Sequence, residues 1–259
     1  MDSVERTAQA VFSARAAHYV TSAAHADAEV LGRMVALAEP TPEWRVLDIA
    51  TGTGHTAFAF APHVRCVAAT DLTFAMLREA RDAVQAGSLR YEGGAGVCFF
   101  QADVHGLPFA EGAFDCVTSR RAPHHFSDIS RALREMRRVV RAGGTLVIDD
   151  RSVPEDDFVD TAMNRLDAYH DRSHVRQYRP GEWRRMLDEV GFEVTNSELY
   201  TKHRPLTSFT KDVCAEDVAA IEAMLGGLAT REREKLGYET VNGEPHSTHW
   251  YVMIAATAA

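Results

Sequence analysis

The sequence predicts one α/β domain built on a doubly wound, mostly parallel sheet of seven strands with helices on both faces. Short apolar runs of strand length alternate with helical segments along the chain. The clearest unit lies at residues 44–61, where an apolar run leads into Gly52 and Gly54 and a helical segment follows. Glycines permit positive φ there, and the helix N-terminus behind them offers free N–H groups to a ligand.

The first half of the chain supplies four strands and their helices. Alanines and spaced apolar residues predict helices over residues 1–39, which Pro40 and Pro42 end. The apolar spacing after the second strand predicts another helix, and glycines beyond it predict a loop. The expected ranges are 65–71 for the second strand, 73–85 for the helix, 88–96 for the loop, 97–101 for the third strand and 114–118 for the fourth.

The second half continues the alternation and adds a cap. Apolar residues from Ile129 to Val140 recur at helical intervals, and Gly143 and Gly144 are expected to end that helix. The polar, histidine-bearing segment 154–180 interrupts the pattern and is predicted to lie over the strand ends. The other expected elements are a fifth strand at 145–148, a helix at 182–190, a sixth strand at 192–199, helices at 207–236 and a closing strand at 249–256.

Composition excludes some classes of partner. Twenty-eight basic residues against 37 acidic ones give a net charge of −9, so no electrostatic footprint for nucleic acid is present. The four cysteines form no C-x-x-C pair and no zinc spacing, which suits a reducing cytosol. No stretch approaches the ~20 apolar residues of a membrane span. We therefore expect a cytoplasmic protein with a small-molecule substrate, no nucleic acid and no membrane partner; a homodimer stays open.

Charged residues follow the predicted strands at the edge where ligands bind to such sheets. They are Asp48, Asp71, Asp103, Arg120 and Asp149. Asp48 stands before the glycine turn, in the spacing D-x-A-x-G-x-G. Ala50 lies two residues before Gly52 in this spacing. A carboxylate there suits a cationic amino-acid ligand and would repel a pyrophosphate. The pattern therefore favours a site for a cationic amino-acid ligand over a dinucleotide site.

Five segments together resemble one enzyme family. They read V-L-D-I-A-T-G-T-G-H-T-A, V-A-A-T-D-L-T-F-A-M-L, F-F-Q-A-D-V-H-G-L-P-F, F-D-C-V-T-S-R-R-A-P-H-H-F and L-R-E-M-R-R-V-V-R-A-G-G-T-L-V-I-D-D. They are similar to the Rossmann-like class I S-adenosylmethionine-dependent methyltransferases, in particular to the small-molecule enzymes related to the ubiquinone/menaquinone-biosynthesis C-methyltransferases. The resemblance implies S-adenosylmethionine as cofactor and one domain over 1–259: an N-terminal helical cap (1–39), a cofactor-binding core (44–150), a lid insertion (151–180) and a C-terminal completion of the sheet (181–259).

The resemblance also assigns cofactor contacts. Asp71 would accept both ribose hydroxyls, Asp103 the adenine amino group, and Arg120 would border the sulfonium. A helix cap for Asp71, a surface salt bridge for Arg120 and a plain core role for Tyr19 stay open. The full cofactor set is Tyr19, Asp48, Ala50, Thr51, Gly52, Gly54, Asp71, Leu72, Met76, Asp103, Val104 and Arg120.

Histidines are the candidates for acid–base chemistry. A general base assists methyl transfer when the acceptor is a hydroxyl, an amine or an enolisable carbon. His124 and His125 follow the fourth strand, where the methyl group would lie, although a packing role stays open for both. An acceptor site in the cap is expected from Tyr169, His170, Arg172, His174, Arg176 and Tyr178, whose arginines and aromatics suit an anionic or aromatic acceptor.

Other readings of the same residues remain. His170 and His174 stand at i, i+4, but no third ligand at a recognised spacing accompanies them, so no metal is expected. One alternative function is an NAD-dependent oxidoreductase, against which Asp48 argues. Another is a methyltransferase-like scaffold that binds S-adenosylmethionine but catalyses a different reaction or only binds a partner.

Overall fold

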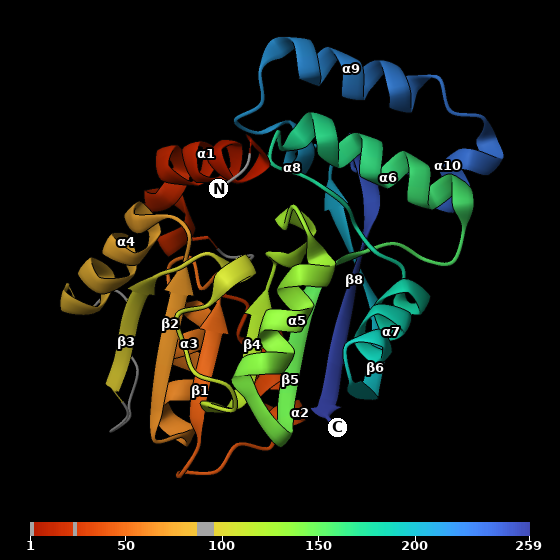
Figure 1. The fold of residues 1–259 in the computed structure, drawn as a ribbon. Coiled ribbons are helices and arrows are strands. Elements are labelled where there is room, and N and C mark those ends of the chain that lie inside the picture. The colour runs from red at the N-terminus through yellow and green to blue at the C-terminus, as the bar shows by residue number, and fades with distance from the viewer. Residues whose placement is uncertain (1–2, 23–24, 87–95) are drawn as a thin grey trace.

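A central sheet of eight strands organises the molecule (Figure 1). The computed structural model describes residues 3–22, 25–86 and 96–259. Seven strands run in the order β3-β2-β1-β4-β5-β8-β6, and β7 pairs with β8. The first five positions are parallel, and β8 is antiparallel to its neighbours. The strands are β1 (Arg45–Ile49), β2 (Cys66–Asp71), β3 (Gly96–Gln101), β4 (Phe114–Arg120), β5 (Val140–Ser152), β6 (Phe192–Pro205), β7 (Glu239–Val241) and β8 (Glu244–Ala258).

Helices cover both faces of the sheet because its strands alternate apolar side chains between the two faces. Leu47 packs toward α5 and α7, whereas its neighbour Val46 packs toward α2 and α3. The helices are α1 (Ser3–Val20), α2 (Ala28–Ala38), α3 (His55–Phe60), α4 (Phe74–Gln85), α5 (Ile129–Val139), α6 (Asp157–His170), α7 (Pro180–Glu189), α8 (Thr207–Thr210), α9 (Ala215–Gly226) and α10 (Thr230–Leu236). In the described ranges, no helix is both long and apolar enough to cross a bilayer.

A third layer lies beyond the carboxyl ends of the parallel strands. Figure 1 shows α1, α6, α8, α9 and α10 on that side of the sheet. Helices α6, α8, α9 and α10 share an apolar core that includes Met163, Phe209, Ile221 and Leu236. The cap therefore combines the 154–180 segment with helices from 207–236, which the sequence interpretation kept apart.

The predicted doubly wound sheet is confirmed, with the short strand β7 in addition. The helical region expected over 1–39 is two helices, and α2 packs on the sheet rather than in the third layer. Three short 3-10 turns also occur, at Ala61–His63, Val104–Gly106 and Pro123–His125. Of the loop expected at 88–96, residues 88–95 lie outside the described part of the chain.

The glycine pair after α5 has another role than the one predicted. The helix ends at Val139, and Gly143 and Gly144 lie inside β5, where the ladder with β4 is irregular. Gly143 has φ +66°, and a Cβ on Gly144 would come within 2.8 Å of the Asp115 carbonyl oxygen. The glycines therefore permit an irregular strand pairing and do not cap the helix.

Candidate active site

Two adjoining cavities lie at the carboxyl ends of the strands. The first, of about 120 Å³, is lined by the glycine turn, the ends of β2 and β4 and the inner side of α1. The second, of about 820 Å³, is lined by α1, the end of α6 and the outer parts of β6 and β8. The residues common to both linings are Phe12, Tyr19, His25, Arg121 and His125. The two cavities therefore meet along a shared wall.

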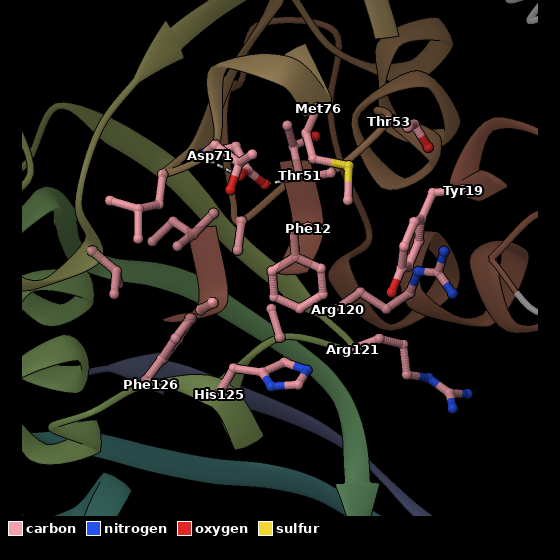
Figure 2. Close-up of a pocket in the computed structure, with 18 of the residues that line it drawn as sticks. Phe12, Tyr19, Thr51, Thr53, Asp71, Met76, Arg120, Arg121, His125 and Phe126 are labelled. Atoms are coloured by element: carbon pink, nitrogen blue, oxygen red, sulfur yellow. Dashed lines mark hydrogen bonds between the residues drawn. The ribbon is translucent and has the colours of Figure 1, made fainter. Parts of the chain in front are cut away.

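Asp71 and the glycine turn form one end of the first cavity (Figure 2). The Gly52 N–H donates to Asp71 Oδ2 at 2.9 Å, and the Thr73 N–H donates to Oδ1 at 2.8 Å. Burial raises the pKa of Asp71 to about 6. Each carboxylate oxygen keeps a second lone pair, so Asp71 can accept hydrogen bonds from two hydroxyls of a ligand. The contact to Thr73 holds the residue that precedes α4, but Asp71 accepts no N–H from the helix itself.

The two glycines of the turn are required for different structural reasons. Gly52 has φ +56°, and a Cβ placed on it would meet no described atom within 4 Å, so this side of the turn faces open space. Gly54 has φ +89°, and a Cβ there would lie 2.5 Å from the Phe58 ring. Gly52 lines the first cavity and Gly54 does not. Gly54 is thus required by packing at the start of α3 rather than by a ligand.

Asp48 lies behind the cavity wall. Its side chain is buried in β1 and accepts hydrogen bonds from Thr51 Oγ1 at 2.6 Å and Thr118 Oγ1 at 2.7 Å. Burial raises its pKa to about 6. Asp48 is not among the lining residues, whereas Ala50 and Thr51 are. Its observed contacts position Thr51, and the direct approach to an amino acid that the sequence suggested is not seen.

Arg120 is buried at the end of β4 and lines the first cavity. Its Nε donates to Thr56 Oγ1 at 3.1 Å and its Nη2 to the His25 carbonyl oxygen at 2.5 Å. Its Nη1 is buried and has no hydrogen-bond partner among the described residues. The predicted alternative of a surface salt bridge is wrong, because the described residues give Arg120 no carboxylate partner. Both N–H donors of Nη1 are thus left for a ligand acceptor.

The remaining predicted cofactor residues line the same cavity. They are Tyr19, Leu72, Met76, Asp103 and Val104. Asp103 Oδ1 accepts from the His105 N–H at 2.9 Å and lies 2.8 Å from His105 Nδ1. Glu5 Oε1 lies 2.9 Å from the same nitrogen. Ligand atoms of Glu5, Asp103 and His105 fall within 4.8 Å of one another, the spacing that a metal ion could use.

Sequence interpretation missed most of the contribution of α1. Glu5, Ala8 and Phe12 line the first cavity together with Tyr19. Figure 2 shows Phe12 between Met76 and His125 in the view. Glu5, Phe12 and Tyr19 are seven residues apart and therefore share one helix face. That spacing was the available signal: combined with the expected N-terminal cap and with Tyr19, it would have indicated Glu5 and Phe12 as well.

The two candidate histidines sit in different surroundings. His125 lines both cavities, whereas His124 is buried and lines only the second. His124 Nδ1 lies 2.6 Å from Asp150 Oδ1, and its backbone N–H donates to Asp150 Oδ2 at 2.8 Å. Burial lowers the pKa of His124 well below its ordinary value and raises that of Asp150 to about 7. The rings of the two histidines lie 3.9 Å apart.

The cap supplies fewer cavity residues than predicted. His170 and His174 line the second cavity, but Tyr169, Arg172, Arg176 and Tyr178 line neither. Carboxylates hold both arginines: Arg172 pairs with Asp217 at 2.6 Å, and Arg176 with Asp160 at 2.8 Å and Glu182 at 3.1 Å. The two tyrosines pack against apolar clusters. His170 and His174 bond to different acceptors, the Phe209 carbonyl oxygen and Asn164 Oδ1.

Other residues of the second cavity had no sequence signal of their own. They include His25, Arg121, Arg151, Arg204, His249 and Tyr251. Asp149, predicted at a strand end, lies inside β5, where it pairs with Arg121 at 2.7 Å. The outer parts of β6 and β8 bring Arg204 and His249 to the cavity; Arg204 was missed because β6 extends beyond the predicted end at residue 199, whereas His249 lies within the predicted strand and had no motif to single it out.

Comparisons with known proteins agree with this geometry. A family model described as a methyltransferase domain matches residues 47–148. The chain is 39% identical over 181 residues to an uncharacterized methyltransferase, YcgJ, from Bacillus subtilis, a match that covers 70% of each chain. It is 33% identical over 178 residues to the ubiquinone/menaquinone biosynthesis C-methyltransferase UbiE of a Marinomonas strain, covering 60% of this chain and 69% of that one.

A solved structure extends the agreement to the fold. The crystal structure of a putative methyltransferase from Bacillus halodurans has a TM-score of 0.81 at 30% identity, over 88% of this chain and 97% of that one. The similar sequences and the similar structure are methyltransferases, which argues against the alternative function of an NAD-dependent oxidoreductase. The chain belongs to the class I methyltransferase family, whose methyl donor is S-adenosylmethionine.

Proposed function

We propose that this methyltransferase holds S-adenosylmethionine in the first cavity and a small-molecule acceptor in the second, with His125 acting at the wall between them. The observation that carries the proposal is that five residues line both cavities. Direct methyl transfer requires the donor site and the acceptor site to adjoin, because the displacement needs the nucleophile, the methyl carbon and the sulfur in line.

The residues of the first cavity fit the donor. Asp71 keeps lone pairs for two ribose hydroxyls, and Gly52 presents a side without a Cβ to the ligand. The unpartnered Nη1 of Arg120 suits the carboxylate of the methionyl group, in place of the sulfonium that the sequence suggested. Leu72, Met76 and Val104 supply apolar contacts for the adenine, with Asp103 beside them.

Hydrogen bonds distinguish His125 from His124 as the base. His125 Nδ1 lies 3.1 Å from the Ser173 carbonyl oxygen, which only accepts, so Nδ1 carries the proton. With Nδ1 as the donor, Nε2 is the ring nitrogen that can accept a proton. Ser173 is itself held by Asp171 at 2.6 Å. Although burial raises it, the pKa of Asp171 is kept down at about 2, chiefly by His125 and Ser173. This arrangement fixes the ring of His125.

In the proposed step, His125 Nε2 takes a proton from the acceptor. The acceptor atom then forms a bond to the methyl carbon, and the carbon–sulfur bond breaks with its electron pair going to sulfur. S-adenosylmethionine supplies the methyl group as a sulfonium. His124 is a weaker base because burial lowers its pKa, so we assign it to the acceptor wall, oriented by Asp150.

The function is tested by incubating the protein with methyl-labelled S-adenosylmethionine and a panel of phenols, amines and enolisable carbonyl compounds. The proposal expects label in a small product and an equal amount of S-adenosylhomocysteine. Conversion of a panel compound without label transfer would instead favour a scaffold that binds the donor and catalyses another reaction.

The affinity for the donor should depend on pH through Asp71. Ribose hydroxyls bond best to the ionised carboxylate, and burial places the pKa of Asp71 at about 6. Affinity should therefore rise as pH rises through 6, by about tenfold between pH 5 and pH 8. Calorimetric titration with S-adenosylhomocysteine measures this. In Asp71→Asn the rise should vanish, and an equal rise in that variant would contradict the assignment.

Replacing each of the two glycines with alanine should impair a different property: ligand binding for Gly52 and stability for Gly54. Both positions have positive φ, so both variants incur a similar backbone strain of about 1 kcal/mol. Gly52→Ala adds a methyl group in open space and should fold but bind S-adenosylhomocysteine weakly. Gly54→Ala drives a Cβ into Phe58 and should lower the unfolding temperature more. Thermal unfolding and titration of both variants decide; equal effects in both assays would refute the distinction.

A further inference from the structure

The second cavity has two ends with different chemistry. One end, at the shared wall, carries His124 and His125. The other lies against the outer parts of β6 and β8, which extend into the third layer (Figure 1). There Arg204 of β6 pairs in register with Ser247 of β8, and His249 follows on the same face of the strand.

Arg204 is a cation without a carboxylate partner in the described ranges. The other arginines of the inner wall are paired, Arg121 with Asp149 at 2.7 Å and Arg151 with Asp167 at 2.9 Å. Among the described residues, Arg204 Nε is buried and has no hydrogen-bond partner. One guanidinium N–H is thus left for an acceptor group that the described residues do not provide.

Ser208 and Lys211 come to the same place. A smaller hollow of about 460 Å³ adjoins this end, and Arg204, Ser208 and Lys211 line both it and the second cavity. Asp212 also lines the second cavity and, like Lys211, is exposed to solvent, so Arg204 and Lys211 against Asp212 leave one positive charge in excess. This end of the cavity therefore carries net positive charge in a protein whose overall charge is −9.

Titratable groups in the cavity respond to this charge. Burial raises the pKa of Tyr251, yet Arg121, Arg151 and Arg204 together bring it below its ordinary value. Burial lowers the pKa of His249 strongly, and Arg151 and Arg204 lower it further. His249 therefore stays neutral and adds no positive charge at this end.

We infer that this end of the second cavity is an anion subsite for the methyl acceptor, built by Arg204 with Ser208 and Lys211 at its edge. The acceptor is then a small molecule with a carboxylate or phosphate at the end opposite to the methylated atom. A guanidinium favours both groups because it donates two parallel N–H bonds to them. The inference rests on the proposed function, which places the acceptor in this cavity.

The test is calorimetric titration of the protein, saturated with S-adenosylhomocysteine, with three probes: benzoate, phenyl phosphate and the neutral benzamide. At least one anion should bind at least tenfold more tightly than benzamide, and the tighter anion identifies the group. Arg204→Gln should abolish that preference, Arg204→Lys should retain most of it, and Arg185→Gln, which removes an exposed arginine on α7, should leave it unchanged.

Equal affinity for the three probes, or an undiminished preference in Arg204→Gln, would overturn the subsite. The affinity for S-adenosylhomocysteine, measured first in every variant, separates this failure from that of the proposed function. Arg204 does not line the first cavity, so Arg204→Gln should bind S-adenosylhomocysteine as the unmodified protein does. If Arg204→Gln fails to fold, Lys211→Gln, at an exposed position, should still reduce the preference for the anion.

Discussion

Replacing His125 with asparagine should slow methyl transfer by about 10²–10⁴-fold, the usual contribution of a general base. The asparagine amide can still donate to the Ser173 carbonyl oxygen, as Nδ1 does at 3.1 Å, but it has no counterpart to Nε2. The variant therefore keeps the wall between the cavities while losing the base. Single-turnover rates with labelled donor measure the loss, with the donor affinity determined separately.

A pH profile separates a base from a packing residue. Without His125 the acceptor must ionise unaided, so the rate for His125→Asn should rise about tenfold per pH unit until the acceptor itself titrates. His63→Asn, at an exposed histidine, is the matched control and should behave as the unmodified protein. A rate for His125→Asn within threefold of the control at every pH would remove His125 from the chemistry.

Replacing Asp71 with alanine should weaken donor binding at least tenfold. Hydrogen bonds to a charged group contribute about 1.5–3 kcal/mol each, and tenfold in affinity corresponds to about 1.4 kcal/mol. Asp71→Asn retains one acceptor oxygen and should lose less than the alanine variant. Titration with S-adenosylhomocysteine at pH 8, where the carboxylate is ionised, gives the three affinities.

A neighbouring carboxylate provides the control for Asp71. Asp82 lies on α4, half exposed and paired with Arg81 at 3.0 Å. Asp82→Asn changes the net charge by the same amount but should leave donor affinity unchanged. Because Asp71 also accepts the Gly52 and Thr73 N–H groups, circular dichroism must show that each variant is folded. An affinity for folded Asp71→Ala equal to that of Asp82→Asn would refute the ribose assignment.

The sequence was most informative where local pattern and fold coincide. The glycine turn, the end of β2 at Asp71 and the start of the 3-10 turn after Asp103 could be read from short motifs, because each motif residue lies within a few positions of its strand. Leu72, Met76 and Val104 follow the same logic. The doubly wound sheet followed from the alternation of strands and helices, whereas the strand order came from the structure.

What the sequence did not predict depends on contacts between distant segments. Arg172 and Arg176 have the composition of a ligand site, but Asp217, Asp160 and Glu182 already hold their charges. Arg204 shows the reverse. Only the pairing of β6 with β8 brings it to the second cavity, where the described residues give it no carboxylate partner. Whether an arginine is paired is a property of the fold, and no local spacing reveals it.

The same holds for the two histidines. Their position after β4 was evident, but the choice between them came from Ser173 and Asp150, which are 48 and 26 residues away in the chain. An N-terminal cap with Tyr19 was expected, but the rest of the α1 face over the first cavity, Glu5 and Phe12, was missed although it shares the seven-residue spacing.

The most direct measurement is a crystal structure of the protein with S-adenosylhomocysteine bound. The account predicts the ribose hydroxyls on both oxygens of Asp71, the amino-acid carboxylate at Arg120 and the sulfur facing His125 and the second cavity. A nucleoside bound elsewhere, or a sulfur turned away from the wall that the two cavities share, would contradict it.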